Sequence, residues 1–322
     1  MTGGPTPTAM SPDEQRRRQR SGLVFATVSA AAFGSSGPMG RALIDAGWTA
    51  GSAVFVRLGG AAVLLGGYLA LRQRHLLRLT RHTARILVIY GLVAMAGVQF
   101  AFFNAVQTLD VGIALLLEYL APVLLLLWTS LRVRRLPAGP TLLGAALSLI
   151  GLVLVLDLRG EVSVDPVGVG WGLLAAVCLA GYFAMSARQE ETLPPVVMAA
   201  GGTAVGAAAL GLAGLVGLIP MSFSTATTEL AGSDVAWWVP ALWLVVITST
   251  TAYLTGIAGV VRLGSRTASF VSLSEVLFGV LTAWVLLAQL PGLVQLIGGV
   301  AILTGIVLVQ RSELLTGPDP VG

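Results

Sequence analysis

The sequence is poor in charge and in reactive side chains. It contains no lysine, one cysteine (Cys178) and two histidines, and only 11% of its 322 residues are charged. Soluble chains carry about 25% charged residues, so water is not the main solvent of this protein. A single cysteine excludes an intrachain disulfide and a multi-cysteine metal site. No phosphate-binding loop of the G-x-x-x-x-G-K type occurs, and the sequence predicts no metal site and no cofactor.

Long apolar segments fill most of the chain. Hydrophobic residues make up 56% of it, and the mean hydropathy is +0.87. Segments of roughly 20 apolar residues can each cross a hydrocarbon core of about 30 Å. Ten such segments are expected at 21–40, 51–71, 84–105, 111–131, 138–157, 168–187, 195–218, 237–259, 267–287 and 291–310. The sequence therefore predicts an all-α integral membrane protein with ten transmembrane helices, preceded by a disordered cytoplasmic tail at 1–20.

The distribution of arginine predicts the direction of these spans. Short cytoplasmic loops hold an excess of basic residues. With the N-terminus in the cytoplasm, 16 of the 19 arginines fall in cytoplasmic segments, whereas Arg41 and Arg159 fall outside and Arg57 lies within a span. Both termini are therefore expected in the cytoplasm, with the protein in the inner membrane of a bacterium. Topology accounts for the basic residues, so no nucleic-acid partner is expected.

Two parts of the chain carry the same pattern. Each has a Leu-Pro pair followed by two glycines at 7 and 14 residues after the proline, namely Leu136-Pro137 with Gly144 and Gly151, and Leu290-Pro291 with Gly298 and Gly305. Glycines at this spacing share a helix face and favour close helix packing. One acid precedes each pattern in an apolar helix, Glu118 and Glu275. The pattern indicates a duplicated unit.

The duplication has a consequence for orientation. The copies are expected at 21–157 and 168–311, joined by a linker at 158–167 and followed by a cytoplasmic tail at 312–322. Five helices per copy is an odd number, so the second copy enters the membrane upside down. Inverted repeats of this kind suit alternating access to a site between them.

The ten segments and the duplicated unit resemble the EamA-type family of the drug/metabolite transporter superfamily. The stretches that carry the resemblance are 107–128 and 249–291. Together with 55–64, they look most like bacterial threonine/homoserine-type amino-acid exporters. The resemblance implies two inverted five-helix bundles around a central cavity, with secondary transport that does not use ATP. The family's ninth helix typically ends in Gly-Glu, where this chain has Ala288-Gln289.

Three ionisable residues lie inside expected spans. A charge near the bilayer centre costs about 2.5–3.5 kcal/mol, so it usually faces a partner or a wet cavity. Arg57 and Glu118 are expected roughly 10 Å from the outer edge. These two residues either form a structural salt bridge with each other or belong to a substrate site. In the second case, Arg57 binds the carboxylate of the substrate, and Glu118 binds an amine or a coupling proton. Glu275, at the mirrored depth, either accepts structural hydrogen bonds or relays protons.

Uncharged polar residues extend this candidate substrate site. Asn104 and Gln107 share a helix face at i and i+3, while Gln99 faces elsewhere. Such amides either join helices through hydrogen bonds or line a cavity. Tyr182 and Tyr253 are suited to the wall of a pocket.

These observations favour a carrier. The sequence predicts a secondary transporter that exports a small polar metabolite, with an amino acid as one candidate, and its partners are the substrate, membrane lipids and protons. A channel and a non-transporting membrane scaffold are the alternatives. An intramembrane enzyme would need a nucleophile, a base and metal ligands at one depth. The chain offers no such set, and no catalytic residue is expected.

Overall fold

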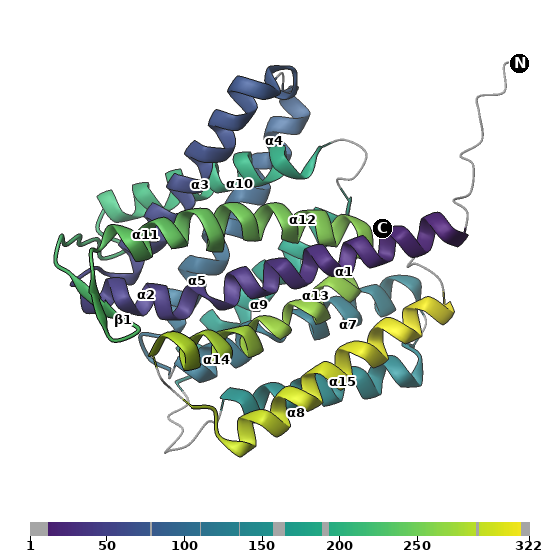
Figure 1. The fold of residues 1–322 in the computed structure, drawn as a ribbon. Helices are drawn as coiled ribbons and strands as arrows, with labels where there is room; N and C mark the ends of the chain where they lie inside the picture. Colours follow the sequence, from purple (N-terminus) through teal and green to yellow (C-terminus); the bar gives the residue numbers. More distant parts are fainter. Residues whose placement is uncertain are drawn as a thin grey trace, which may run out of the picture.

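The computed structural model describes residues 12–77, 79–109, 111–134, 136–156, 165–188, 193–287 and 290–316, and most of them are helical (Figure 1). The first half contains α1 (Pro12–Gly34), α2 (Ser36–Asp45), α3 (Ala50–Arg72), the 3₁₀ turn η1 (Arg74–Leu77), α4 (Arg81–Tyr90), the π-helical η2 (Gly91–Gly97), α5 (Val98–Ala105), α6 (Val111–Glu118), α7 (Ala121–Val133) and α8 (Gly139–Leu156). The second half contains α9 (Pro166–Arg188), α10 (Pro195–Leu215), the strands β1 (Thr228–Leu230) and β2 (Ser233–Val235), α11 (Trp238–Val245), the π-helical η3 (Val246–Thr251), α12 (Ala252–Leu263), α13 (Ser265–Ser272), α14 (Ser274–Leu287) and α15 (Leu293–Thr316).

Nine helices or helix runs in the described part of the chain are long and apolar enough to cross a membrane. They lie where nine of the ten spans were expected, so a multi-span helical membrane protein is confirmed. The first expected span differs. Its residues are divided at Ser35 between α1 and α2, and α1 begins at Pro12 and includes four arginines near its start. Residues 12–20, expected in a disordered tail, are therefore helical. Most of the linker expected at 158–167 lies outside the described residues.

Polar side chains determine where several helices begin. The hydroxyl of Thr49 accepts a hydrogen bond from the backbone N–H of Ser52 and caps α3. The Asp165 carboxylate accepts the Gly168 N–H at 3.0 Å at the start of α9, and this bond lowers the pKa of Asp165. Such caps satisfy backbone donors that the first helical turn leaves without partners. Pro166, directly after Asp165, has no N–H to satisfy.

The glycine pairs of the repeated pattern pack α8 against α15. A Cβ atom on Gly144 would lie 2.7 Å from the carbonyl oxygen of Gly305, and one on Gly298 would lie 2.6 Å from that of Gly151. Contacts this close exclude larger residues. Since the later glycine of one helix meets the earlier glycine of the other, α8 and α15 run antiparallel.

The helices α3 and α10 also run antiparallel to each other. Phe55 on α3 packs at Gly211, and Leu58 packs at Gly206, so residue numbers rise on one helix as they fall on the other. The helices that open the two halves also have matching neighbours. α1 packs mainly on α12 and α14, whereas α9 packs on α5 and α6. The pairs α8–α15 and α3–α10 thus join equivalent helices of the two halves. α1 and α9 each pack on helices of the opposite half, and these occupy equivalent positions in the two halves.

Two long helices are interrupted beside the acids of the repeats. α6 ends at Glu118 and α7 begins at Ala121. Pro122 explains this break, because it lacks the N–H that would bond to the carbonyl of Glu118. The second break separates α13 from α14 just before Glu275. There the hydroxyl of Ser274 donates to the carbonyl of Val271 at 2.7 Å. Hydroxyl bonds of this kind bend helices.

Two π-helical segments lie at equivalent places, η2 in the third span and η3 in the eighth. In η3, the hydroxyls of Thr250 and Thr251 donate to the carbonyls of Val245 and Val246, five residues earlier, at 2.8 and 2.9 Å. These bonds support the wider turn. Since π-helical segments often mark functional sites, we expect η2 and η3 to lie near the functional site of the protein.

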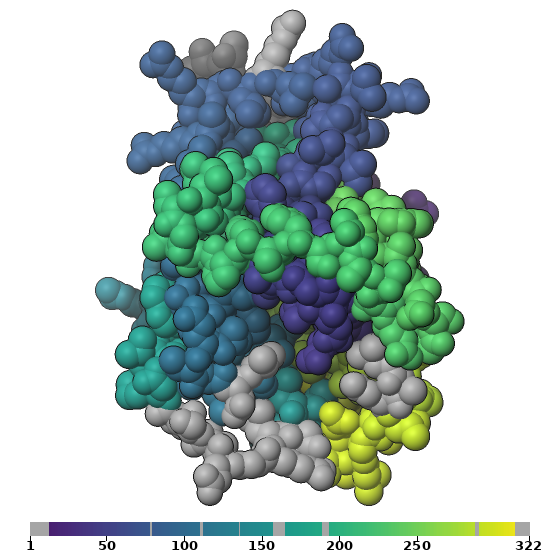
Figure 2. Space-filling view, turned by 90° about the vertical axis from the view of Figure 1, so that its left-hand side faces the viewer, coloured from purple at the N-terminus to yellow at the C-terminus, as the bar shows by residue number. Residues whose placement is uncertain are grey.

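A short hairpin marks one face of the bundle. β1 and β2 pair antiparallel, with Ala231 and Gly232 at positive φ in the turn. The segment between α10 and α11, green in Figure 2, lies beside α2 and the start of α3, where Ser222 accepts the N–H of Thr49. α1 begins and α15 ends on the opposite side of the molecule (Figure 1). We call the side of the hairpin the hairpin face and the other the terminal face.

The contact between α8 and α15 generates a stability prediction. Replacing Gly298 with valine is expected to lower the free energy of unfolding by about 1–3 kcal/mol, because overpacking forces the two helices apart. Gly66 on α3 has open space around it, so Gly66→Val is the matched control and should leave stability nearly unchanged. Thermal unfolding in detergent measures both. Equal stability of the Gly298 variant and the control would show that the glycines do not determine the packing.

Candidate functional site

A cavity of about 230 Å³ lies at the centre of the bundle, lined by helices from both halves. Its polar lining consists of Ser29, Ser36, Arg57, Gln99, Glu118, Tyr119, Tyr182, Tyr253, Ser272 and Glu275. All three ionisable residues expected inside spans therefore line one cavity. We call it the central cavity.

Arg57 provides the positive charge of the central cavity. Its side chain is 9% exposed, and its guanidinium donates to the hydroxyl of Tyr253 at 3.4 Å. The guanidinium carbon also lies 6.0 Å from the ring centroid of Phe33. Among the described residues, no hydrogen-bond partner reaches its Nε, and no ion pair within 4.0 Å joins it to Glu118. The structure therefore does not contain the Arg57–Glu118 salt bridge, which was one of the two expectations for this pair.

Two acids face Arg57 across the central cavity. Glu118 is the last residue of α6, and Glu275 is the second residue of α14. Both are half-buried and close enough for attraction by Arg57. The hydroxyl of Tyr119 lies within hydrogen-bonding reach of the Glu275 carboxylate. One cation and two acids in a cavity of this size can bind groups of either charge.

Aromatic side chains form one wall of the central cavity. The ring of Tyr253 meets that of Phe33 edge-on, with centroids 5.0 Å apart, and lies 6.5 Å from that of Tyr182. Both tyrosines are buried, as expected for pocket walls. Gly256 allows this arrangement, since a Cβ atom there would lie 2.7 Å from the hydroxyl of Tyr182.

The expected amides are not part of this lining. Asn104 donates to the carbonyl of Phe100 in its own helix at 2.7 Å, and Gln107 is exposed beyond the end of α5. Gln99 lines the cavity instead. The helix ends two residues before Gln107, so the i, i+3 relation on which the expectation rested does not hold there.

Sequence reasoning missed several residues of the central cavity besides Gln99, among them Tyr119 and Phe33. Tyr119 directly follows Glu118, so its position beside an intramembrane acid was a usable signal. Phe33 lies in an apolar stretch and gave none. Within the described ranges, no group of three His, Cys, Asp or Glu side chains is placed to hold a metal ion.

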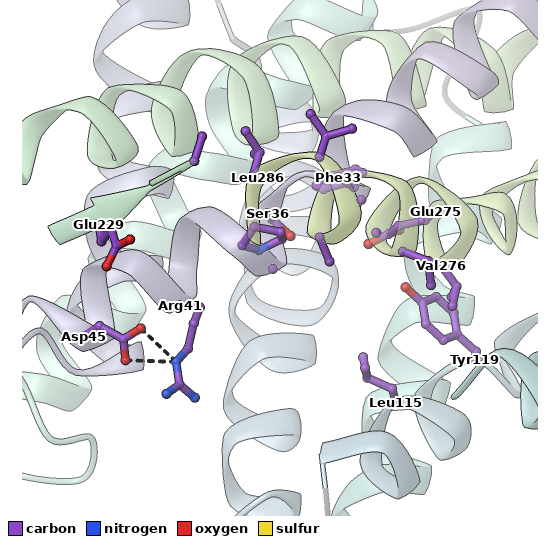
Figure 3. Close-up of a pocket in the computed structure, with 18 of the residues that line it drawn as sticks. Phe33, Ser36, Arg41, Asp45, Leu115, Tyr119, Glu229, Glu275, Val276 and Leu286 are labelled. Atoms are coloured by element: carbon purple, nitrogen blue, oxygen red, sulfur yellow. Dashed lines mark hydrogen bonds and ion pairs between the residues drawn. The ribbon is translucent and has the colours of Figure 1, made fainter. Parts of the chain in front are cut away.

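A wider cavity of about 1200 Å³, which we call the vestibule, adjoins the central cavity on the hairpin face. The two share residues that include Glu275 and Tyr119. Figure 3 shows these two residues at one end of the vestibule and Glu229 and Arg41 at the other. Arg41 pairs there with Asp45 at 2.9 Å. The vestibule leads from the hairpin face to the two acids.

Arginine contacts join the helices on the terminal face. Arg18 of α1 donates to the carbonyl of Val261 in α12 at 3.0 Å, and Arg266 of α13 donates to Thr129 of α7 at 3.0 Å. Arg262 of α12 stacks on an aromatic ring of α1, 4.6 Å from its centroid. These contacts join α1 to α12 and α7 to α13 on the side of the central cavity that faces away from the vestibule.

The chain is similar to one membrane transporter over nearly its whole length and to another over part of it. It is 24% identical over 300 residues to the uncharacterized inner membrane transporter YicL of Salmonella typhimurium, covering 90% of this chain and 95% of that protein. It is 31% identical over 126 residues to the threonine/homoserine exporter RhtA of Escherichia coli strain K12, covering 39% of this chain and 40% of the exporter. A solved crystal structure shares the fold, with a TM-score of 0.68 at 20% identity over 95% of this chain and 100% of that one.

The model of the EamA-like transporter family matches residues 20–157 and 166–311. The two matches coincide with the two halves that carry the glycine pattern and the intramembrane acids. This multi-pass membrane protein belongs to the EamA-like transporter family.

Proposed function

We propose that this protein exports a small zwitterionic metabolite of the amino-acid type across the cytoplasmic membrane. Two inverted five-span repeats expose the central cavity alternately to either side. Arg57 binds the carboxylate of the substrate, and Glu118 with Glu275 binds its amine and the coupling protons. Arg57 carries this proposal, since it is a buried cation in a small cavity with two acids near it and, among the residues that the structure describes, forms no ion pair with either.

The helix pairings support the inverted repeat. α8 and α15 are the last helices of the two halves, and they run antiparallel to each other. α3 and α10 are likewise equivalent helices of the two halves, and they too run antiparallel. Copies inserted in the same orientation would place each such pair parallel. The pairings of α1 and α9 also match when the halves are exchanged. Symmetry of this kind lets each half adopt the arrangement of the other.

The positions of the chain ends support a tenth span and the orientation. α1 begins and α15 ends on the terminal face (Figure 1), which requires an even number of crossings. The described part of the chain contains nine apolar spans, so we assign the tenth crossing to α1 with α2. Since the arginine excess falls on this face, the terminal face is the cytoplasmic one.

The shape of the cavities supports a carrier over a channel. The vestibule joins the central cavity to the hairpin face, while arginine contacts close the helices together on the terminal face. A site open to one side and closed to the other is one of the two states that alternating access requires. We assign this structure to the outward-open state.

The size and lining of the central cavity indicate the class of substrate. A volume of 230 Å³ corresponds to about eight water molecules at about 30 Å³ each. It therefore suits a small solute of about the size of an amino acid. The partial match to a threonine/homoserine exporter agrees with this estimate.

Substitution of Arg57 tests the proposed substrate contact. Hydrogen bonds to a charged group contribute about 1.5–3 kcal/mol, so Arg57→Gln should raise the apparent KM for efflux about 10- to 150-fold. Arg57→Lys should retain part of the affinity. The measurement is efflux of labelled threonine, homoserine and larger amino acids from loaded vesicles.

Arg72→Gln, at the end of α3, is the matched control because it removes an exposed arginine from the same helix. It should transport like the wild type. Saturable efflux that is unaffected by Arg57→Gln would remove Arg57 from the substrate site, and flux that does not saturate would favour a channel.

The two acids generate a separate prediction about protons. If Glu118 and Glu275 carry the coupling protons, Glu118→Gln and Glu275→Gln should abolish the response of efflux to an imposed pH gradient. Exchange of labelled for unlabelled substrate needs no net proton movement, so at least one of the variants should retain it. Wild-type dependence on the pH gradient in both variants would exclude the acids from coupling.

A further inference from the structure

The structure contains a third cavity that the transport site does not use. It is a groove of about 490 Å³ on the outer surface of the bundle, between α7 and α9. Its floor includes the small residues Ala180 and Ala184 of α9, and its walls include Leu127 and Trp128 of α7, which are 54% and 50% exposed. An apolar groove exposed on a membrane-spanning surface excludes water and is filled by hydrocarbon.

The groove extends through one leaflet of the bilayer. On α9 it runs from Val177 to Arg188, which is about 16 Å along a helix. Half of a hydrocarbon core of about 30 Å is about 15 Å. On α7 it begins at Leu124 and continues to Leu131, next to Arg132. Its length therefore matches an acyl chain that starts at the interface.

The interfacial end of the groove is basic. Arg188 lines it as the last residue of α9. Arg132 lies with its guanidinium 4.7 Å from the ring centroid of Trp128, another lining residue. Basic groups between membrane helices recognise the phosphate of anionic lipids. Charge at the interface and an apolar groove of one leaflet's depth are the two features that such a lipid requires.

We propose that this groove binds one anionic glycerophospholipid, with an acyl chain between α7 and α9 and its phosphate at Arg132 and Arg188. The site is separate from the substrate cavity. α9 lies between them, because Tyr182 and Phe183 face the central cavity while Ala180 and Ala184 face the groove. A lipid here would brace the helix that positions Tyr182.

Native mass spectrometry of the purified protein tests this site with phosphatidylglycerol and phosphatidylcholine as probes. The wild type should retain phosphatidylglycerol in preference. A basic residue near the membrane surface contributes about 1 kcal/mol to binding anionic lipid, so Arg132→Gln should weaken retention about fivefold. Because two glutamates lie two and three residues after Arg188 in the sequence, the substitution of Arg132 gives the clearer test of the positive charge. Arg72→Gln removes one arginine from the terminal face elsewhere and should have no effect.

A second variant tests the groove itself. Ala184→Phe should fill it and reduce retention of phosphatidylglycerol while leaving Arg132 in place. Thermal unfolding in added lipid serves as a second readout if that variant is unstable. The proposal is overturned if phosphatidylglycerol and phosphatidylcholine are retained equally, if Arg72→Gln weakens binding as much as Arg132→Gln, or if inorganic phosphate alone gives the same stabilisation as the lipid.

Discussion

The cost of placing charge inside a bilayer governs the arrangement of this protein. Each of Arg57, Glu118 and Glu275 would cost about 2.5–3.5 kcal/mol near the middle of a lipid-facing helix. The fold brings all three to one cavity, which the vestibule joins to one face. Attraction between opposite charges and access to water both reduce the cost. The helices around the cavity must therefore leave room at their centre while they pack closely elsewhere.

Close helix packing and interrupted helices occur in different parts of the bundle. Glycines let α8 and α15 approach closely at the edge of the bundle, where no cavity is needed. Near the centre the helices are interrupted, next to Glu118 by Pro122 and next to Glu275 by the turn between α13 and α14. Backbone groups released at such breaks are tolerated in a membrane only where protein or a wet cavity surrounds them. The interruptions therefore belong to the site as much as the acids do.

The two halves share a frame but not a binding surface. Helix breaks, π-helical segments and glycine contacts recur in both. Arg57 has no basic counterpart in α10, and Tyr119 corresponds to Val276 in the second copy. The symmetric features suit the exchange of conformations between halves, whereas the asymmetric side chains suit recognition of a substrate with two different ends.

The sequence predicted the features that depend on composition and spacing. Apolar length located nine of the spans, and a lone acid in each copy identified residues that line the central cavity. Features that depend on the exact helix path could not be predicted. α5 ends at Ala105 and follows a π-helical segment, which places Gln99 at the cavity and leaves Asn104 and Gln107 out of it. The hairpin between α10 and α11 lies in a polar loop with no strand pattern long enough to recognise.

Accessibility of single cysteines from each side of the membrane tests alternating access most directly. Cys178 is the only native cysteine and is buried, so a Cys178→Ala background is suitable. Ala283→Cys in the vestibule and Ala268→Cys on the opposite side of the central cavity would be labelled with an impermeant maleimide. We expect Ala283→Cys to react from the hairpin face at rest, and Ala268→Cys to react from the terminal face only when substrate drives turnover. Labelling of both positions from one face under all conditions would contradict a cavity that alternates between the two sides.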